Sequence, residues 1–155
     1  MSIVFNFQKS KFAISQRTLV RRWITEVIVR GGGRVGAVSY FFCDDNYLIG
    51  RNRQFLQHDT FTDIITFDYV GGNLISGDIL ISVERVRENA ANMNIPFDEE
   101  LHRVIIHGIL HLLGQGDKTP AEAAEMRAKE DMALSLLKEL KADVSRGTNS
   151  SSRCC

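Results

Sequence analysis

The sequence predicts an α+β domain, in which one small mixed sheet of about four strands carries helices packed on it. Short apolar runs of strand length form one class of segment, and longer segments with apolar residues three and four apart form the other. Their order also matters: strand, helix, strand, helix, then two strands, then three helices. The strands fall at residues 2–7, 35–44, 62–70 and 74–82, and the helices at 15–30, 44–56, 83–94, 98–114 and 119–142.

The first four segments follow from periodicity and from residues that begin or end helices. "SIVFNF" alternates in the manner of a strand. In the segment 15–30, Leu19, Trp23 and Val27 have helical spacing, with Ser15 as the expected N-cap. Gly31–Gly33 then ends the helix, and "VGAVSYFFCD" forms the second strand. Asp44 or Asp45 begins the short helix that follows.

The second half predicts a hairpin and three helices. "TDIITFDYV" and "LISGDILIS" flank Gly71-Gly72-Asn73, which favours a turn between two strands. The last helix has a capping box, with Thr119 as N-cap and Glu122 three residues later. Residues 143–155 are small, polar and aperiodic, so we expect a single domain over residues 1–142 and a disordered tail.

Charge and cysteine content limit the protein class. Residues 1–53 carry nine lysines and arginines against three acids, and residues 54–144 carry eight against sixteen. The first third could therefore offer a basic face to a polyanion, or could simply be a solvated surface. The three cysteines, one at position 43 and two adjacent at 154 and 155, predict no disulfide framework. The sequence shows no signal peptide and no membrane-spanning run, so we expect a cytoplasmic protein.

The segment "VIIHGILHLL", residues 104–113, raises the main functional question. It is apolar on all sides, which is typical of a buried helix, yet it carries His107 and His111. Residues four apart lie on one face, so both imidazoles point the same way. They either line a cleft open to water or bind a divalent metal. Both interpretations stay open, because most isolated HxxxH pairs are not metal ligands.

A third ligand follows in the sequence. Gly114 is suited to end the helix and turn the chain back, and this brings Asp117 towards the histidines. The spacing H-x3-H-x2-G-x2-D is that of the metzincin zinc site with aspartate as third ligand, so this is a metzincin-like helix. Zn(II) is the favoured ion, with Fe(II) and Mn(II) as alternatives, and three protein ligands leave a position for water.

The residue after the first histidine separates two classes of enzyme. HExxH proteases have a glutamate there, whereas this chain has Gly108, which disfavours peptide hydrolysis. Two other polar residues are assigned by pattern. Asp78 either orients a metal-bound histidine or marks a β-bulge, and His102 is expected on the surface.

"HGILHLLGQGDK" resembles the H-G-x-L-H-L-x-G-x-D-H signature of the YbeY family of metal-dependent endoribonucleases. "TDIITF" and "SGDILIS" resemble two further motifs of that family, in the same order. The resemblance implies one zinc ion and cleavage of single-stranded RNA by a metal-bound water. It also implies a role in maturing the 3′ end of small-subunit ribosomal RNA and in ribosome quality control.

The resemblance also assigns residues. His107 and His111 fall on the first two metal ligands, and Asp117 stands where the family usually has a third histidine. Asp63 and His58 lie where the family has the metal cleft, so either could be the proton carrier, or they could equally be a capping aspartate and a surface histidine. Leu56 replaces a usual arginine, and we expect Arg51 and Arg53 to supply the charge towards RNA. The alternatives are a metallohydrolase for another substrate, and a ribosome-assembly factor with a structural metal; oligomeric state is left open.

Overall fold

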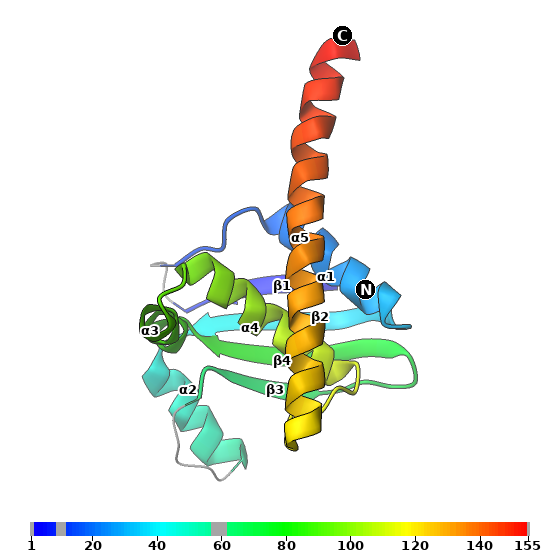
Figure 1. Cartoon of the computed structure of the whole chain (residues 1–155). Coiled ribbons are helices and arrows are strands. Elements are labelled where there is room, and N and C mark those ends of the chain that lie inside the picture. Colours follow the sequence, from blue (N-terminus) through cyan, green and yellow to red (C-terminus); the bar gives the residue numbers. More distant parts are fainter. Residues whose placement is uncertain (1, 9–11, 57–61, 155) are drawn as a thin grey trace.

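The structure is a computed structural model, which describes residues 2–8, 12–56 and 62–154. Its elements follow the predicted order, with each predicted strand and helix present (Figure 1). The strands are β1 (Ser2–Phe7), β2 (Arg34–Cys43), β3 (Ile64–Asp68) and β4 (Leu74–Ser82). The helices are α1 (Arg17–Arg30), α2 (Asp45–Arg51), the π-helical turn η1 (Asn52–Leu56), α3 (Val83–Met93), α4 (Phe97–Leu112) and α5 (Pro120–Cys154).

The four strands form one mixed sheet in the order β1-β2-β4-β3, which confirms the predicted α+β class. β1, β2 and β4 are parallel, whereas β3 pairs antiparallel with β4 and forms an edge of the sheet. The hairpin turns at Gly72, whose positive φ of 57° suits glycine. β3 lies at the edge of the sheet and contacts α4, one of the helices that cover one face.

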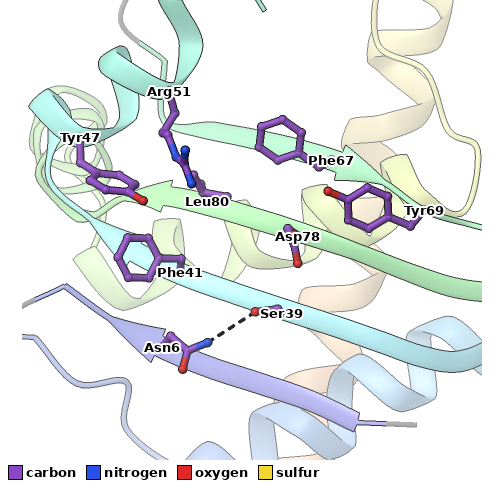
Figure 2. A pocket seen from close by; sticks show the side chains of 9 residues that line it. All are labelled: Asn6, Ser39, Phe41, Tyr47, Arg51, Phe67, Tyr69, Asp78 and Leu80. Carbon is purple, nitrogen blue, oxygen red and sulfur yellow. Dashed lines mark hydrogen bonds between the residues drawn. The ribbon is translucent and has the colours of Figure 1, made fainter. Parts of the chain in front are cut away.

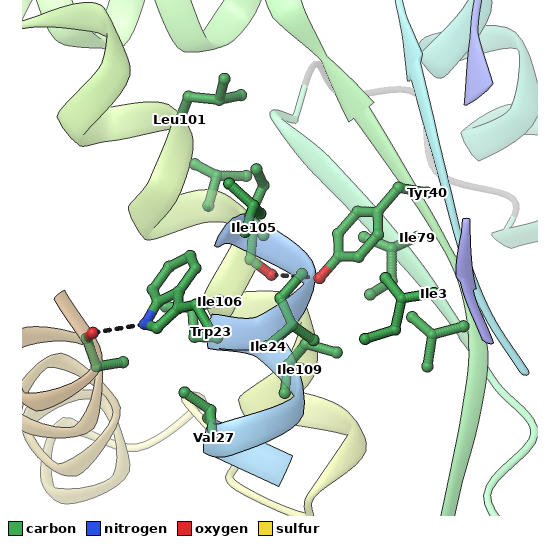
Figure 3. Packing of buried hydrophobic residues seen from close by; sticks show 14 of the residues in the cluster. Ile3, Trp23, Ile24, Val27, Tyr40, Ile79, Leu101, Ile105, Ile106 and Ile109 are labelled. Atoms are coloured by element: carbon green, nitrogen blue, oxygen red, sulfur yellow. Dashed lines mark hydrogen bonds between the residues drawn. The ribbon is translucent and has the colours of Figure 1, made fainter. Parts of the chain in front are cut away.

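The main core lies between that face and helices α1, α4 and α5 (Figures 1 and 3). Two hydrogen bonds from buried aromatic side chains tie the layers together. Tyr40 Oη donates to the Ile105 carbonyl at 2.8 Å, and Trp23 Nε1 donates to the Ala133 carbonyl at 2.7 Å. These bonds link β2 to α4 and α1 to α5, so α4 is held between the sheet and α5.

The helix ends confirm two predicted caps and correct a third. Asp44 accepts from the Tyr47 amide at the start of α2, and Thr119 and Glu122 form the capping box of α5. Ser15, however, does not cap α1. That helix begins at Arg17 after Gln16 turns the chain with φ of 56°, and Gln16 makes no side-chain cap bond, so Ser15 lies one residue too early.

Two further expectations differ from the structure. His102 is buried, not on the surface, because α4 packs against α1 and the ring meets Trp23 edge-on with 5.8 Å between centroids. Residues 143–154 continue α5 as helix, whereas we expected no regular structure there (Figure 1). A helix that is already formed gains one hydrogen bond for each residue it adds, which favours this continuation. Among the described residues, no helix is both long and apolar enough to cross a bilayer.

Candidate metal centre

Helix α4 turns its two histidines away from the core, and His107 lines a cleft. Its opposite side packs on the sheet through apolar residues such as Ile105 and Ile109, which are fully buried. His107 and His111 lie one turn apart with their rings 4.5 Å apart between centroids, and both side chains are partly exposed. The predicted orientation is therefore confirmed for both imidazoles.

The end of α4 returns the chain towards these rings. The Gly114 amide donates to the His111 carbonyl and the Gln115 amide donates to the Leu110 carbonyl, each at 2.9 Å. This pair of bonds is a Schellman motif, and Gly114 adopts the left-handed conformation it requires, with φ of 99°. The turn leaves Asp117 facing α4, as the sequence predicts.

The three side chains converge on one point. His107 Nε2 and His111 Nε2 each lie 3.4 Å from Asp117 Oδ2, and the three ligand atoms lie within 4.8 Å of one another. Ligands held at about 2.0–2.1 Å around a tetrahedral ion are about 3.3–3.4 Å apart. The donor set therefore fits a small divalent ion, and the three ligand atoms found among the described residues would leave one position of a tetrahedral ion for a further ligand.

Each imidazole is oriented by a partner on its other nitrogen. His107 Nδ1 lies 2.6 Å from Glu130 Oε2, and His111 Nδ1 lies 2.9 Å from the Gln115 carbonyl oxygen. A carboxylate and a carbonyl can only accept, so both Nδ1 atoms carry the proton. A histidine binds a metal ion as a neutral ring, and in that form the Nε2 lone pairs would face Asp117, which is the arrangement a metal ligand needs.

Electrostatics couple His107 to Glu130. Burial disfavours charge on both groups and is the largest single effect on His107, but its hydrogen bond to Glu130, together with the negative charges of Glu130, Asp117 and Asp63, raises the pKa of His107. The His107 and Arg103 side chains likewise hold the pKa of Glu130 below its ordinary value, against the effect of burial. Arg103 donates to Glu130 Oε1 at 3.0 Å, so the carboxylate is buried, charged and held by two donors.

Glu130 takes the role that the sequence analysis considered for Asp78, and that assignment was wrong. Asp78 lies on the other face of the sheet, because Ile79 and Ile81 turn inward towards the helices and alternate residues turn outward. A signal for Glu130 exists in the sequence. Met126, Ala133 and Leu137 form a buried stripe along α5, and Glu130 is the carboxylate within it.

Two of the three candidate ligands, His107 and Asp117, line a cleft of about 250 Å³ between α4, α5 and the start of β3. Asp63, one of the two predicted proton carriers, lines this cleft, and burial is the main cause that raises its pKa. Glu100 also lines it, with its Oε1 buried and without a hydrogen-bond partner. The other charged residues that line the cleft are Arg103, Asp117, Arg127 and Glu130.

The remaining predicted residues do not reach the cleft or lie outside the described part. Arg51 lines a separate pocket of about 390 Å³ on the other sheet face, beside Asp78 and with its guanidinium 5.5 Å from the centre of the Tyr47 ring (Figure 2). Arg53 is exposed on η1. His58 lies outside the described residues, so its role stays a prediction.

Comparison with known proteins agrees with this geometry. The profile of the family described as Endoribonuclease YbeY matches residues 4–138. The chain belongs to the YbeY family. A YbeY relative named Endoribonuclease YbeY from Flavobacterium psychrophilum is 50% identical over 134 residues, covering 86% of this chain and 95% of the relative. Another of the same name from Phocaeicola vulgatus is 56% identical over 115 residues, covering 74% and 83%.

The YbeY fold is also seen in a solved structure. The solution structure of TM1509 from Thermotoga maritima superimposes with a TM-score of 0.62, covering 94% of this chain and 93% of that chain. At 24% identity this likeness supports the fold alone. The predicted family and fold are thus confirmed.

Proposed function

We propose that this chain is a metal-dependent endoribonuclease that hydrolyses phosphodiester bonds in single-stranded RNA. One observation carries the proposal: two oriented imidazoles and one carboxylate converge within 4.8 Å at a cleft, with room for a further ligand. Three protein ligands are typical of a catalytic site, whereas structural zinc sites usually have four. Membership of a family described as Endoribonuclease YbeY supports RNA as the substrate.

Different side chains would bind the ion, orient the imidazoles and transfer the proton. His107, His111 and Asp117 would hold the ion, and Glu130 with the Gln115 carbonyl would orient the two rings. A divalent ion held there supplies a Lewis acid that activates water and polarises a phosphoryl oxygen. Asp63 is our candidate for the proton carrier, because its carboxyl group lines the same cleft and burial raises its pKa, which favours the protonated form relative to an exposed aspartate.

We further propose zinc as the ion, since two imidazoles and a carboxylate at tetrahedral spacing suit it, with Mn(II) and Fe(II) as competitors. The resemblance of "HGILHLLGQGDK" to the family signature supports the biological setting. There the substrate is small-subunit ribosomal RNA at its 3′ end, the ribosome is the partner and the compartment is the cytoplasm.

The test is cleavage of a labelled single-stranded RNA by the purified chain with added Zn(II) or Mn(II), beside duplex RNA and casein. We expect cleavage of the single strand only. His111→Ala should abolish it, because the variant lacks one ligand. Asp63→Asn should slow it by about 100- to 10,000-fold while metal content stays unchanged. Asp98→Ala, an exposed aspartate that lies outside the metal cleft, is the matched control.

Two results would overturn the proposal. Cleavage of casein with intact RNA would assign another substrate to the same centre. No turnover of either substrate, together with one tightly bound metal per chain, would indicate a structural metal.

A further inference from the structure

We propose that Arg127 is the residue that contacts an RNA phosphate next to the metal centre, an inference that rests on the proposed function. The cleft is lined by two arginines, Arg103 and Arg127, and by four acidic residues. A phosphodiester is an anion, so its binding there needs a cation that is both near the metal ligands and able to leave its present partner.

Arg103 does not meet the second condition. Its Nη1 donates to Glu130 at 3.0 Å, its Nη2 donates to Asp131 at 2.9 Å, and the side chain is only 17% exposed. Two charge-assisted hydrogen bonds in a largely buried position fix the guanidinium. Arg103 therefore holds Glu130 in place, and its charge is already paired.

Arg127 meets both conditions. It lies on α5, three residues before Glu130, and its side chain is 57% exposed. Its Nη1 is 3.6 Å from Glu130 Oε1, beyond hydrogen-bonding distance, while Glu130 Oε2 contacts His107. The guanidinium thus lies one carboxylate away from a candidate metal ligand, lines the cleft and is exposed to solvent, and no short hydrogen bond to another described residue fixes it.

The net charge of the cleft also favours Arg127 as the phosphate contact. When all four of its carboxyl groups are ionised, the cleft has a formal charge of −2 against its two guanidiniums, with Asp63, Glu100, Asp117 and Glu130 as the acids. A divalent ion at the three ligands brings the total to zero, and loss of Arg127 would return it to −1. A guanidinium also offers two parallel N–H donors to a phosphate, which fixes the strand beside the ion.

Salt dependence of RNA binding tests the proposal directly. Each phosphate neutralised on a single strand contributes about 0.7 to the slope of log affinity against log salt concentration. We measure binding of a fluorescein-labelled single-stranded RNA by anisotropy at several KCl concentrations, and cleavage of the same RNA on gels. Arg127→Ala should bind about tenfold more weakly at low salt and lose about 0.7 of the slope.

Two further variants separate charge from structure. Lys129→Ala is the matched control, because Lys129 is an exposed cation on the same helix but lines a different groove, with Arg30 and Met132. We expect wild-type affinity and slope for it. Arg127→Lys keeps one positive charge, so it should keep the wild-type slope while binding more weakly than arginine.

The outcomes distinguish this proposal from the proposed function. If the wild-type chain cleaves RNA and Arg127→Ala keeps its slope, Arg127 is not a phosphate contact, although the nuclease function stands. If the wild-type chain binds but does not cleave, and Arg127→Ala still loses slope, the contact stands and the nuclease function fails. A chain that neither binds nor cleaves RNA overturns both proposals. If Lys129→Ala loses as much affinity and slope as Arg127→Ala, the specific role of Arg127 is overturned.

Discussion

Replacing Glu130 by glutamine tests how far the metal centre depends on a side chain that would not touch the ion. The substitution keeps the shape of the side chain and removes its charge. Glutamine can still accept one hydrogen bond from His107, but it no longer holds a negative charge against that ring. Arg103 also loses its charged partner at 3.0 Å.

The magnitude follows from the distances. Glu130 Oε2 lies 2.6 Å from His107 Nδ1, and the ring and the metal–nitrogen bond place a bound ion roughly 6 to 7 Å from the carboxylate. Coulomb's law gives a −1 and a +2 charge at that distance about 1.3 kcal/mol in water and about 5 kcal/mol at an effective dielectric constant of 20. Arg103 offsets part of this energy. We therefore expect Glu130→Gln to bind the metal ion 10- to 100-fold more weakly than wild type, which corresponds to about 1.4–2.7 kcal/mol of binding free energy.

The assay is competition for Zn(II) against a fluorescent chelator at fixed pH. Glu125→Gln is the control, since Glu125 lies on the same helix but is exposed. The reasoning is refuted if Glu130→Gln and Glu125→Gln bind the ion as tightly as wild type. It is also refuted if Glu130→Gln loses affinity only through unfolding, which a melting curve of the metal-free protein would reveal.

Three further predictions concern the third ligand, the core and a buried histidine. Asp117→Ala should lower the metal content well below one ion per chain, and unchanged stoichiometry would remove Asp117 from the ligand set. Tyr40→Phe should cost about 1 kcal/mol in denaturant unfolding, because the lost bond to Ile105 is buried; a neutral variant would contradict this. Burial and the positive charge of Lys141 lower the pKa of His102 from 6.5 to about 4 in the folded protein. Between pH 6.5 and pH 4, His102 is therefore protonated in the unfolded chain but not in the folded one. Unfolding free energy should therefore fall by up to roughly 3 kcal/mol from pH 6.5 to 4, and His102→Phe should remove that part of the dependence.

The convergence of His107, His111 and Asp117 could be predicted from the sequence because it depends on local geometry. A helical repeat of 3.6 residues places His107 and His111 on one face, and the glycine that ends the helix limits where Asp117 can lie. Each inference spans about ten residues, over which bond geometry and turn chemistry determine the structure.

The residues that surround the ligands depend on tertiary packing, and these were harder to predict. Glu130 reaches His107 only because α5 crosses α4, 23 residues further along the chain. Asp78 was misplaced because β4 is apolar on both faces near its end, so alternation alone does not indicate which face the helices cover. Arg51 is near Asp63 in sequence, yet it lines the pocket on the opposite sheet face.

Gly108 shows how that packing determines the chemistry of the cleft. A Cβ there would lie 3.1 Å from Ile64 Cδ1 and from Ile79 Cδ1, so the glutamate of an HExxH protease would have to fit between α4 and the sheet. The carboxylates come instead from the residue before β3, from α4, from α5 and from the loop before α5, and they give the cleft its negative charge. That charge would repel a phosphodiester unless a divalent ion and Arg127 offset it. Metal loading should therefore be needed for RNA to enter the cleft, and not only for its hydrolysis.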